Sequence, residues 1–446
     1  MGALVGCSVL LAAAFGAADE EARPDAAFET VGIYTELGSR TDLIPMLKAS
    51  GYTAYEALDG GFARRPDLHD DYYAGVARGL EAAREAGLDG YVILLTNMAQ
   101  CNGPEAYREA TAFSPKDAAL VAERMAYLRA TVRRLRAHAD GFIVFAGDPG
   151  GDPERATTVE DFIAFAEGVR DIVMEEAPDA QFIVNPWAVA AWDGFPSPFT
   201  TEFWDKEVRL TREVMAREAL VAPGVGVEFP MHNYYRSLAL TAYADEGRAP
   251  ELYPTAADVA ALKARGVRDI WGWPYFLLDE CDDGYSGRTW GHAQAETRYL
   301  HKVVQAGRAL GLTGMVGNIS IDGMDVEALN LYAFGRFCND AEATPATVLR
   351  EFAAALAEEG SVADLVQVIA FVENRSSWEA GLPDRDRLPP LPCTLESPEE
   401  ALATLQGVAP LAEAGLPLRE TPEAYLKRLA GRLRSLAEAD RPEVDG

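Results

Sequence analysis

The chain has 446 residues, 49% of them hydrophobic and 25% charged, and its formal net charge is -30. This composition is typical of a globular protein with a large core and excludes a disordered or fibrous chain. Acidic residues outnumber basic ones by 70 to 40 and no basic cluster interrupts them. We therefore expect neither nucleic acid nor an anionic membrane surface among its partners.

The first segment of the chain has the pattern of an export signal. Residues 3–17 form an apolar run too short to span a bilayer, with a small-residue cleavage site near Ala17, although no Lys or Arg precedes the run. We interpret residues 1–27 as a signal peptide and linker, and expect a secreted or periplasmic protein. A hydrophobic N-terminal helix is one alternative. A lipid anchor on Cys7 is another, because residues 4–7 resemble a lipoprotein cleavage box.

From residue 31 onward, short apolar runs alternate with amphipathic helical patterns. The predicted strands cover residues 31–36, 52–58, 90–98, 141–148, 181–189, 225–233, 269–276 and 314–322. Several helical patterns between them end at a glycine, as helix C-caps do: Gly51, Gly87, Gly266 and Gly311. Strands that alternate with helices pair in parallel, and eight such units in about 290 residues predict a (β/α)₈ barrel. The alternative is an open doubly wound sheet, which the absence of a Gly-rich loop after the first strand disfavours.

After residue 340 the strand patterns stop and only helical ones remain, divided by a proline-rich break at residues 382–392. We expect a catalytic barrel over residues 28–340 and a helical C-terminal extension over residues 341–446. The extension either packs under the barrel or forms a partner surface, for example in a homodimer. No later stretch is long enough to span a membrane, and no cysteine spacing fits a zinc site or a redox pair. We expect no metal and no cofactor.

Catalytic residues of such barrels lie at the carboxyl ends of the strands, where this sequence gathers aromatic, amide and charged side chains. Aromatic faces stack on sugar rings, while carboxylates and amides bond hydroxyls, so the set predicts a carbohydrate site. The alternative is that the aromatic residues cap the barrel core. The candidate substrate-binding residues are Glu36, Glu56, Asn97, Asn185, Trp187, His232, Asn233, Tyr235, Arg236, Trp271, Trp273 and Asp322. Of these, Arg236 would suit a uronate or a sulfate through bidentate hydrogen bonds, unless it packs on a helix or forms a surface ion pair.

Hydrolysis of a glycosidic bond needs two carboxyl groups, one protonated and one ionised. Asp148 is the leading candidate for the acid because it follows the fourth strand in a Gly-Asp-Pro-Gly-Gly turn, where small residues let a substrate approach. The second carboxylate is Glu228, Glu280 or Asp279, and we prefer Glu228 for the ionised role. Asp148 could instead only hold a turn, and Asp279 and Glu280 could belong to a solvated acidic loop.

Residues 314–319, 329–337 and the capped helix at 343–356 resemble the corresponding part of α-glucuronidases and related barrel glycosidases. In that group an Asn-Leu-Tyr-Ala-Phe-Gly-Arg helix follows the last strand. The resemblance covers roughly residues 310–355 and implies a glycosidase barrel with a helical extension. It also implies inversion of configuration by carboxylates at positions near Asp148, Glu228 and Asp279 or Glu280.

The leading hypothesis is an exported glycoside hydrolase that acts on a poly- or oligosaccharide. One alternative is a metal-dependent sugar isomerase or epimerase, with a divalent ion held by Glu228, His232, Asn318 and Asp322. Another alternative is a glycan-binding barrel without catalysis.

Overall fold

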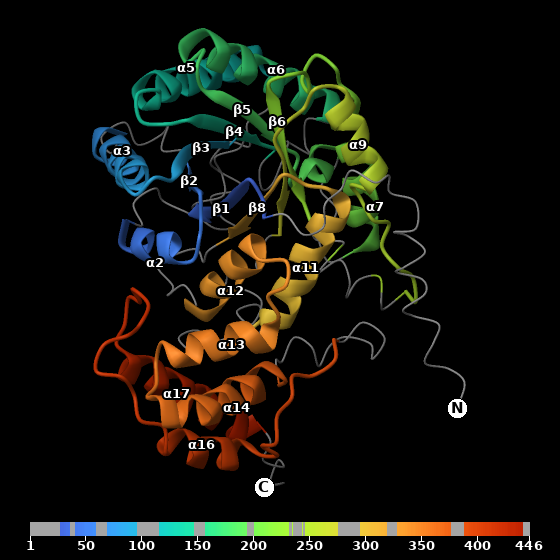
Figure 1. The fold of residues 1–446 in the computed structure, drawn as a ribbon. Coiled ribbons are helices and arrows are strands. Elements are labelled where there is room, and N and C mark those ends of the chain that lie inside the picture. Colours follow the sequence, from blue (N-terminus) through green and yellow to red (C-terminus); the bar gives the residue numbers. More distant parts are fainter. Residues whose placement is uncertain are drawn as a thin grey trace, which may run out of the picture.

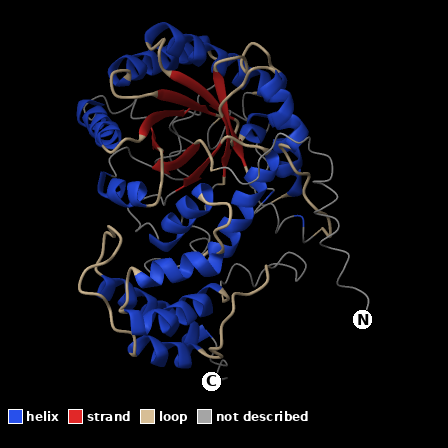
Figure 2. Ribbon diagram, viewed as in Figure 1, coloured by secondary structure: helices blue, strands red, loops and turns tan. Residues whose placement is uncertain are grey.

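The computed structural model describes residues 27–35, 41–58, 69–95, 116–146, 157–193, 200–231, 234, 243, 246–274, 295–318, 328–375 and 388–439. Eight strands form a closed barrel in chain order, and each pairs in parallel with its neighbours (Figures 1 and 2). They are β1 (Thr30–Thr35), β2 (Ala54–Leu58), β3 (Asp89–Leu95), β4 (Gly141–Phe145), β5 (Gln181–Asn185), β6 (Val225–Pro230), β7 (Ile270–Trp273) and β8 (Gly314–Asn318). The predicted (β/α)₈ barrel is confirmed, and the open-sheet alternative is wrong.

Helices surround the barrel, and the four glycines expected as C-caps have left-handed backbone, with φ between 74° and 88°. The elements between strands are η1 (Thr41–Leu43), α2 (Ile44–Ala49), α3 (His69–Glu85), α5 (Ala118–Leu135), α6 (Val159–Glu176), η5 (Val189–Asp193), α7 (Thr201–Ala216), α9 (Ala256–Ala264) and α11 (Thr297–Leu310). After β8 come α12 (Ala328–Asn339), α13 (Pro345–Ala354), η7 (Glu359–Ser361), α14 (Val362–Glu373), α16 (Pro398–Gln406) and α17 (Pro422–Ala439).

Side chains on each strand alternate between the helices and the barrel interior. Near the floor of the interior, the rings of Tyr91 and Trp271 meet edge to face at 5.2 Å. Glycines make room for both rings. A Cβ at Gly141 would lie 2.6 Å from Cδ1 of Tyr91, and a Cβ at Gly314 would lie 2.6 Å from Cδ1 of Trp271. Two large rings therefore fill the floor because the strands beside them carry no side chain there.

The C-terminal helices lie together beside α11 and α12 (Figure 1), and α13 packs on both. A buried ion pair joins the two parts, with Nε of Arg298 on α11 3.2 Å from Oε1 of Glu373 on α14. Glu373 also accepts the backbone N–H of Arg298 at 2.8 Å and the hydroxyl of Thr297 at 2.7 Å. Further along the chain, the carbonyls of Leu388 and Pro389 accept from Nη1 of Arg298. The division into domains at residue 340 stays a prediction.

Among the described residues, no helix is long and apolar enough to cross a membrane. Cys338 is a buried free thiol and Cys393 is a partly buried one. Large hydrophobic side chains that are exposed in the described chain are Met174 and Leu252, and neither belongs to the C-terminal helices. The homodimer through those helices stays a prediction.

Candidate active site

The strand register determines which inward side chains share a level inside the barrel. In a closed eight-stranded barrel the strands are staggered, so alternate strands contribute the four side chains of each layer. Following the observed register around the barrel gives one layer from the even strands: Glu56, Ile143, Glu228 and Val316. The layer above it, from the odd strands, is Tyr34, Ile93, Asn185 and Trp273. Because β2 and β6 lie opposite each other in the ring, Glu56 and Glu228 point toward one another across the interior.

Both glutamates are fully buried, and the protein offers them few polar partners. Nδ2 of Asn185 donates a hydrogen bond to Oε2 of Glu228 at 2.8 Å. Four other buried polar atoms of these glutamates and of Trp271 have no hydrogen-bond partner within the described chain. They are both carboxylate oxygens of Glu56, Oε1 of Glu228 and Nε1 of Trp271. No arginine or lysine contributes to the four side chains of either layer, so no cation there offsets the two acids.

Burial and the mutual repulsion of two carboxylates decide the protonation of this pair. Loss of hydration raises the pKa of Glu56 well above its usual range, and the nearby charge of Glu228 raises it further. Burial also raises the pKa of Glu228, to about 8, while the hydrogen bond from Asn185 acts in the opposite direction. Both shifts favour the protonated form of the two carboxyl groups. A raised pKa favours the protonated form, whereas we preferred Glu228 for the ionised role, and that role stays a prediction.

Aromatic rings lie at and above the level of Asn185. Trp273 contacts three of them edge-on or tilted, with centroid distances of 5.3 Å to Phe145, 5.9 Å to Trp187 and 6.1 Å to Tyr34. Each of these four rings is less than one tenth exposed. The ring of Trp271 belongs to the floor, three layers below Phe145, and its substrate-binding role stays a prediction. The aromatic cluster at the carboxyl end thus consists of Tyr34, Phe145, Trp187 and Trp273.

The turn after β5 holds Asn185 in place. Oδ1 of Asn185 accepts the backbone N–H of Trp187 at 2.9 Å, and Ala188 has a left-handed backbone with φ 62°. Glu207 on α7 supports this turn: its carboxylate accepts the N–H of Ala188 at 2.9 Å and the N–H of Ala190 at 2.7 Å. Glu207 is not among the site residues predicted from the sequence.

A signal for Glu207 was nevertheless present. Phe203, Glu207, Leu210 and Val214 follow the spacing of a helix face, and all four are buried. A single carboxylate on an otherwise apolar stripe must find hydrogen-bond donors in the core, which is the role that Glu207 has.

The structure describes six of the predicted site residues: Glu56, Asn185, Trp187, Glu228, Trp271 and Trp273. It brings Glu56, Asn185, Glu228 and the rings of Trp187 and Trp273 to neighbouring levels of one interior. The other predicted site residues lie outside the described residues: Glu36, Asn97, Asp148, His232, Asn233, Tyr235, Arg236, Asp279, Glu280 and Asp322. Within the described chain, no group of three or more His, Cys, Asp or Glu side chains could hold a metal ion.

The segment that resembles α-glucuronidases serves packing. In α12, Leu331 accepts the hydroxyl of the buried Tyr52 through its carbonyl at 2.9 Å, and Arg336 pairs with Glu351 on α13. A Cβ at Gly335 would lie 2.2 Å from the carbonyl oxygen of Ser50, so only glycine lets α12 approach α2 this closely. The contacts of these residues are packing contacts between α12 and its neighbours.

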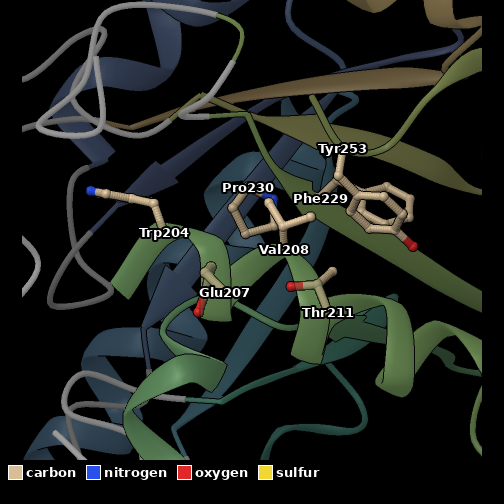
Figure 3. A pocket seen from close by; sticks show the side chains of 7 residues that line it. All are labelled: Trp204, Glu207, Val208, Thr211, Phe229, Pro230 and Tyr253. Atoms are coloured by element: carbon tan, nitrogen blue, oxygen red, sulfur yellow. The ribbon is translucent and has the colours of Figure 1, made fainter. Parts of the chain in front are cut away.

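Outside the barrel wall, a hollow of about 20 Å³ lies between α7 and the end of β6 (Figure 3). Its lining includes Glu207, Thr211, Pro230 and Tyr253. This volume corresponds to about one water molecule, so the hollow is not a ligand site.

Fold and interior together define a parallel eight-stranded β/α barrel with a buried acid pair beneath aromatic rings. Comparison with models of protein families finds no match, and comparison with curated proteins finds none either.

Among solved structures, the chain is similar to an O-GlcNAc hydrolase mutant of Thermobaculum terrenum, with 11% identity and a TM-score of 0.48 over 85% of this chain and 74% of that one. It is also similar to CpGH84D (10% identity, TM-score 0.48, 92% and 64% covered). A third is the exo-β-1,4-mannosidase Op5Man5 from Opitutaceae bacterium strain TAV5 (14% identity, TM-score 0.42, 70% and 60% covered). The chain spans less than two thirds of the length of the last two proteins. These neighbours are barrel glycoside hydrolases, but likenesses this weak decide neither the reaction nor the substrate.

Proposed function

We propose that the chain is a glycoside hydrolase, with its site at the carboxyl end of the barrel and Glu228 as the proton donor. The observation that carries the proposal is a buried carboxyl group with a raised pKa, bonded by Asn185 and adjacent to a cluster of aromatic rings. A general acid must hold its proton at neutral pH and release it during the reaction. Burial gives Glu228 the first property, and the amide of Asn185, which stabilises the carboxylate, favours the second.

The ionised partner in this proposal comes from the carboxylates that the sequence places after β4 and β7. Asp148 is the first candidate, and Asp279 and Glu280 are the others. The roles are therefore exchanged relative to our sequence-based preference, since Glu228 now supplies the proton. A second carboxylate would act as the base or as the nucleophile.

The substrate in this proposal is a poly- or oligosaccharide that stacks on Tyr34, Phe145, Trp187 or Trp273. Rings of this kind favour the apolar faces of sugars. A uronate-containing glycan of the α-glucuronidase type belongs among the test substrates because Arg236 follows β6 in the chain.

Release of reducing sugar tests the proposal, with neutral, uronic and sulfated glycans offered to the purified wild type and to Glu228→Gln and Asp148→Asn. Gln and Asn keep the shape of the side chain but cannot deliver a proton. The control is Glu175→Gln, a carboxylate on α6 that pairs with Arg129 at the surface. We expect turnover by the wild type and the control, and a loss of about 10²-fold or more in Glu228→Gln.

Other outcomes point elsewhere. A fully active Glu228→Gln would refute its role as the proton donor and leave Asp148, Asp279 and Glu280. Binding without turnover on any glycan would favour a glycan-binding barrel. Activity that disappears with a chelator would favour the metal-dependent isomerase.

We also propose that residues 1–27 direct export. Expression of the full chain in a bacterial host with a periplasm, followed by mass measurement of the product, tests this. A mature chain that begins near residue 18 outside the cytoplasm supports the proposal. An uncleaved cytoplasmic chain contradicts it, and a lipid mass on Cys7 would identify a lipoprotein instead.

A further inference from the structure

Glu207 makes contacts that are unusual for a surface helix of a barrel. Its side chain is 5% exposed and points from α7 to the turn after β5. Both carboxylate oxygens are used there, one on the N–H of Ala188 and one on the N–H of Ala190. Bonds from two backbone donors to a carboxylate are charge-assisted and fix the geometry of the segment that donates them.

The turn needs such support because its backbone is strained. Ala188 adopts φ 62°, a left-handed conformation that a residue with a Cβ rarely takes. Strained residues of this kind persist only where the surroundings determine the conformation. In this turn, the carboxylate of Glu207 bonds the backbone N–H groups of Ala188 and Ala190, the residues on either side of Val189.

The same turn determines the orientation of Asn185. The side-chain amide has one acceptor and one donor end. Its Oδ1 faces the N–H of Trp187 at 2.9 Å, so its Nδ2 faces Oε2 of Glu228 at 2.8 Å. If Trp187 moved, the acceptor end would lose its donor, and the amide would no longer be constrained to donate to Glu228.

We infer that Glu207 is a positioning residue. Through the turn from Trp187 to Ala190, it holds the side-chain amide of Asn185 in the orientation that donates to Glu228. In this inference Glu207 acts on the acid pair through Asn185.

Other charged groups near Glu207 are engaged elsewhere. Lys206 on α7 donates to the carbonyl of Asp193 at the end of η5, and Arg209 pairs with the carboxylate of Asp193. Tyr253 lines the same small hollow as Glu207 (Figure 3). On the side of the acid pair, Tyr91 is a titratable neighbour of Glu56 within the described chain, and its hydroxyl donates to Gln181 at 3.1 Å.

Titration of the buried acids tests the inference without any substrate. The variants are Glu207→Gln, which can accept only one of the two N–H groups, and Glu207→Asp, a milder change that keeps the charge. Carboxyl resonances of ¹³C-labelled glutamate report the titration of Glu56 and Glu228. We expect the pKa of Glu228 to rise in both variants, because the donation from Asn185 that lowers it is weakened.

A matched control separates positioning from a loss of stability. Glu373→Gln also removes the charge of a buried glutamate that accepts a backbone N–H. In this case the N–H belongs to Arg298 at the start of α11. It should lower the melting temperature and leave the titration of Glu228 unchanged. An unchanged titration in both Glu207 variants would overturn the inference, as would an equal shift in Glu373→Gln.

A double-mutant cycle supplies the second test. Asn185→Ala should raise the pKa of Glu228, and Glu207→Gln should add nothing in that background because its effect passes through Asn185. Additive shifts would show that Glu207 acts by another route and would refute the inference.

A kinetic measurement is a separate test, because it rests on the proposed function and the titration does not. If the wild type hydrolyses a glycan, Glu207→Gln should lower kcat/KM by roughly 10- to 100-fold and move the alkaline limb of its pH profile upward. If the wild type hydrolyses none, the proposed function fails, while the titration still decides the role of Glu207.

Discussion

Glu56 and Glu228 make the barrel interior sensitive to pH, because folding takes both carboxyl groups out of water. The native pKa of Glu228, about 8, exceeds the ordinary value of 4.5, and that of Glu56 is raised as well. Between pH 4.5 and about 8 the native state therefore binds more protons than the unfolded state. The free energy of unfolding then falls as pH rises through this window, the opposite of what a salt-bridged carboxylate does.

Glu56→Gln removes one of these acids and should flatten that slope. We expect the variant to exceed the wild type in stability by more at pH 8 than at pH 5. Urea unfolding at pH 5, 6.5 and 8 measures the difference. Glu176→Gln is the control: the partners Arg129 and Arg133 lower the pKa of Glu176 to about 2, so its removal leaves the slope between pH 5 and 8 unchanged. A wild type equally stable at pH 5 and pH 8 would contradict the prediction.

Glycine at the floor of the barrel carries a second prediction. Gly141→Ala would bring a Cβ within 2.6 Å of the Tyr91 ring and 3.0 Å of the carbonyl of Gln181. Overpacking of this kind costs about 1–3 kcal/mol, so the melting temperature should fall by several degrees. Gly360→Ala, where no atom lies within 4 Å of the added Cβ, should change it little. Equal melting temperatures for the two variants would show that the Tyr91 ring can move to make room for the added methyl group.

At the scale of elements, the strands could be predicted because each is a short apolar run bounded by helical patterns. Their ends could not. The predicted strand 181–189 stops at Asn185, because Pro186 follows and Ala188 takes a left-handed backbone that no strand admits.

The site was predictable only in part, for a related reason. The residue types at the strand ends indicated aromatic rings and carboxylates, and Glu228, Asn185 and Trp273 do lie at neighbouring levels. Which acids face each other depends on the stagger of the strands, and the register that determines it is not visible in a single sequence. The partnership of Glu56 with Glu228 came only from the closed barrel.

The turn at Ala188 gives a prediction at this scale. Ala188→Gly should be neutral or stabilise the protein by up to about 1 kcal/mol, since glycine adopts a left-handed backbone without strain. Ala164→Gly, at an exposed position within α6, should instead cost about 1 kcal/mol. Thermal unfolding compares the two. A larger loss at Ala188 than at Ala164 would mean that the methyl group of Ala188 packs against the turn.

The whole molecule depends on the contact between Arg298 and Glu373. Both side chains are buried, and removing Glu373 takes away the carboxylate that Nε of Arg298 contacts at 3.2 Å. Glu373→Ala should therefore cost about 3–5 kcal/mol of unfolding free energy. Glu175→Ala, which breaks a surface pair with Arg129, should leave it nearly unchanged. A loss as small as that of the surface variant would argue against the contact as a strong link between barrel and C-terminal helices.

Self-association is the remaining prediction at this scale. The C-terminal helices show no large exposed hydrophobic side chain among the described residues, so a homodimer through them would rely on polar contacts. Such a dimer should weaken as salt is added. Sedimentation at low and high ionic strength measures this, and a monomer under both conditions would contradict the predicted dimer.

The link at Arg298 also limits how this chain can be divided. A gene truncated after residue 340 would encode all eight strands but would lack Glu373 and the carbonyls of Leu388 and Pro389. The guanidinium and the first turn of α11 would then face solvent or apolar surface without their acceptors. We therefore predict that the barrel does not fold as an independent module. Recombination or fusion that preserves it must carry the C-terminal helices along, so we expect the two to be inherited as one unit.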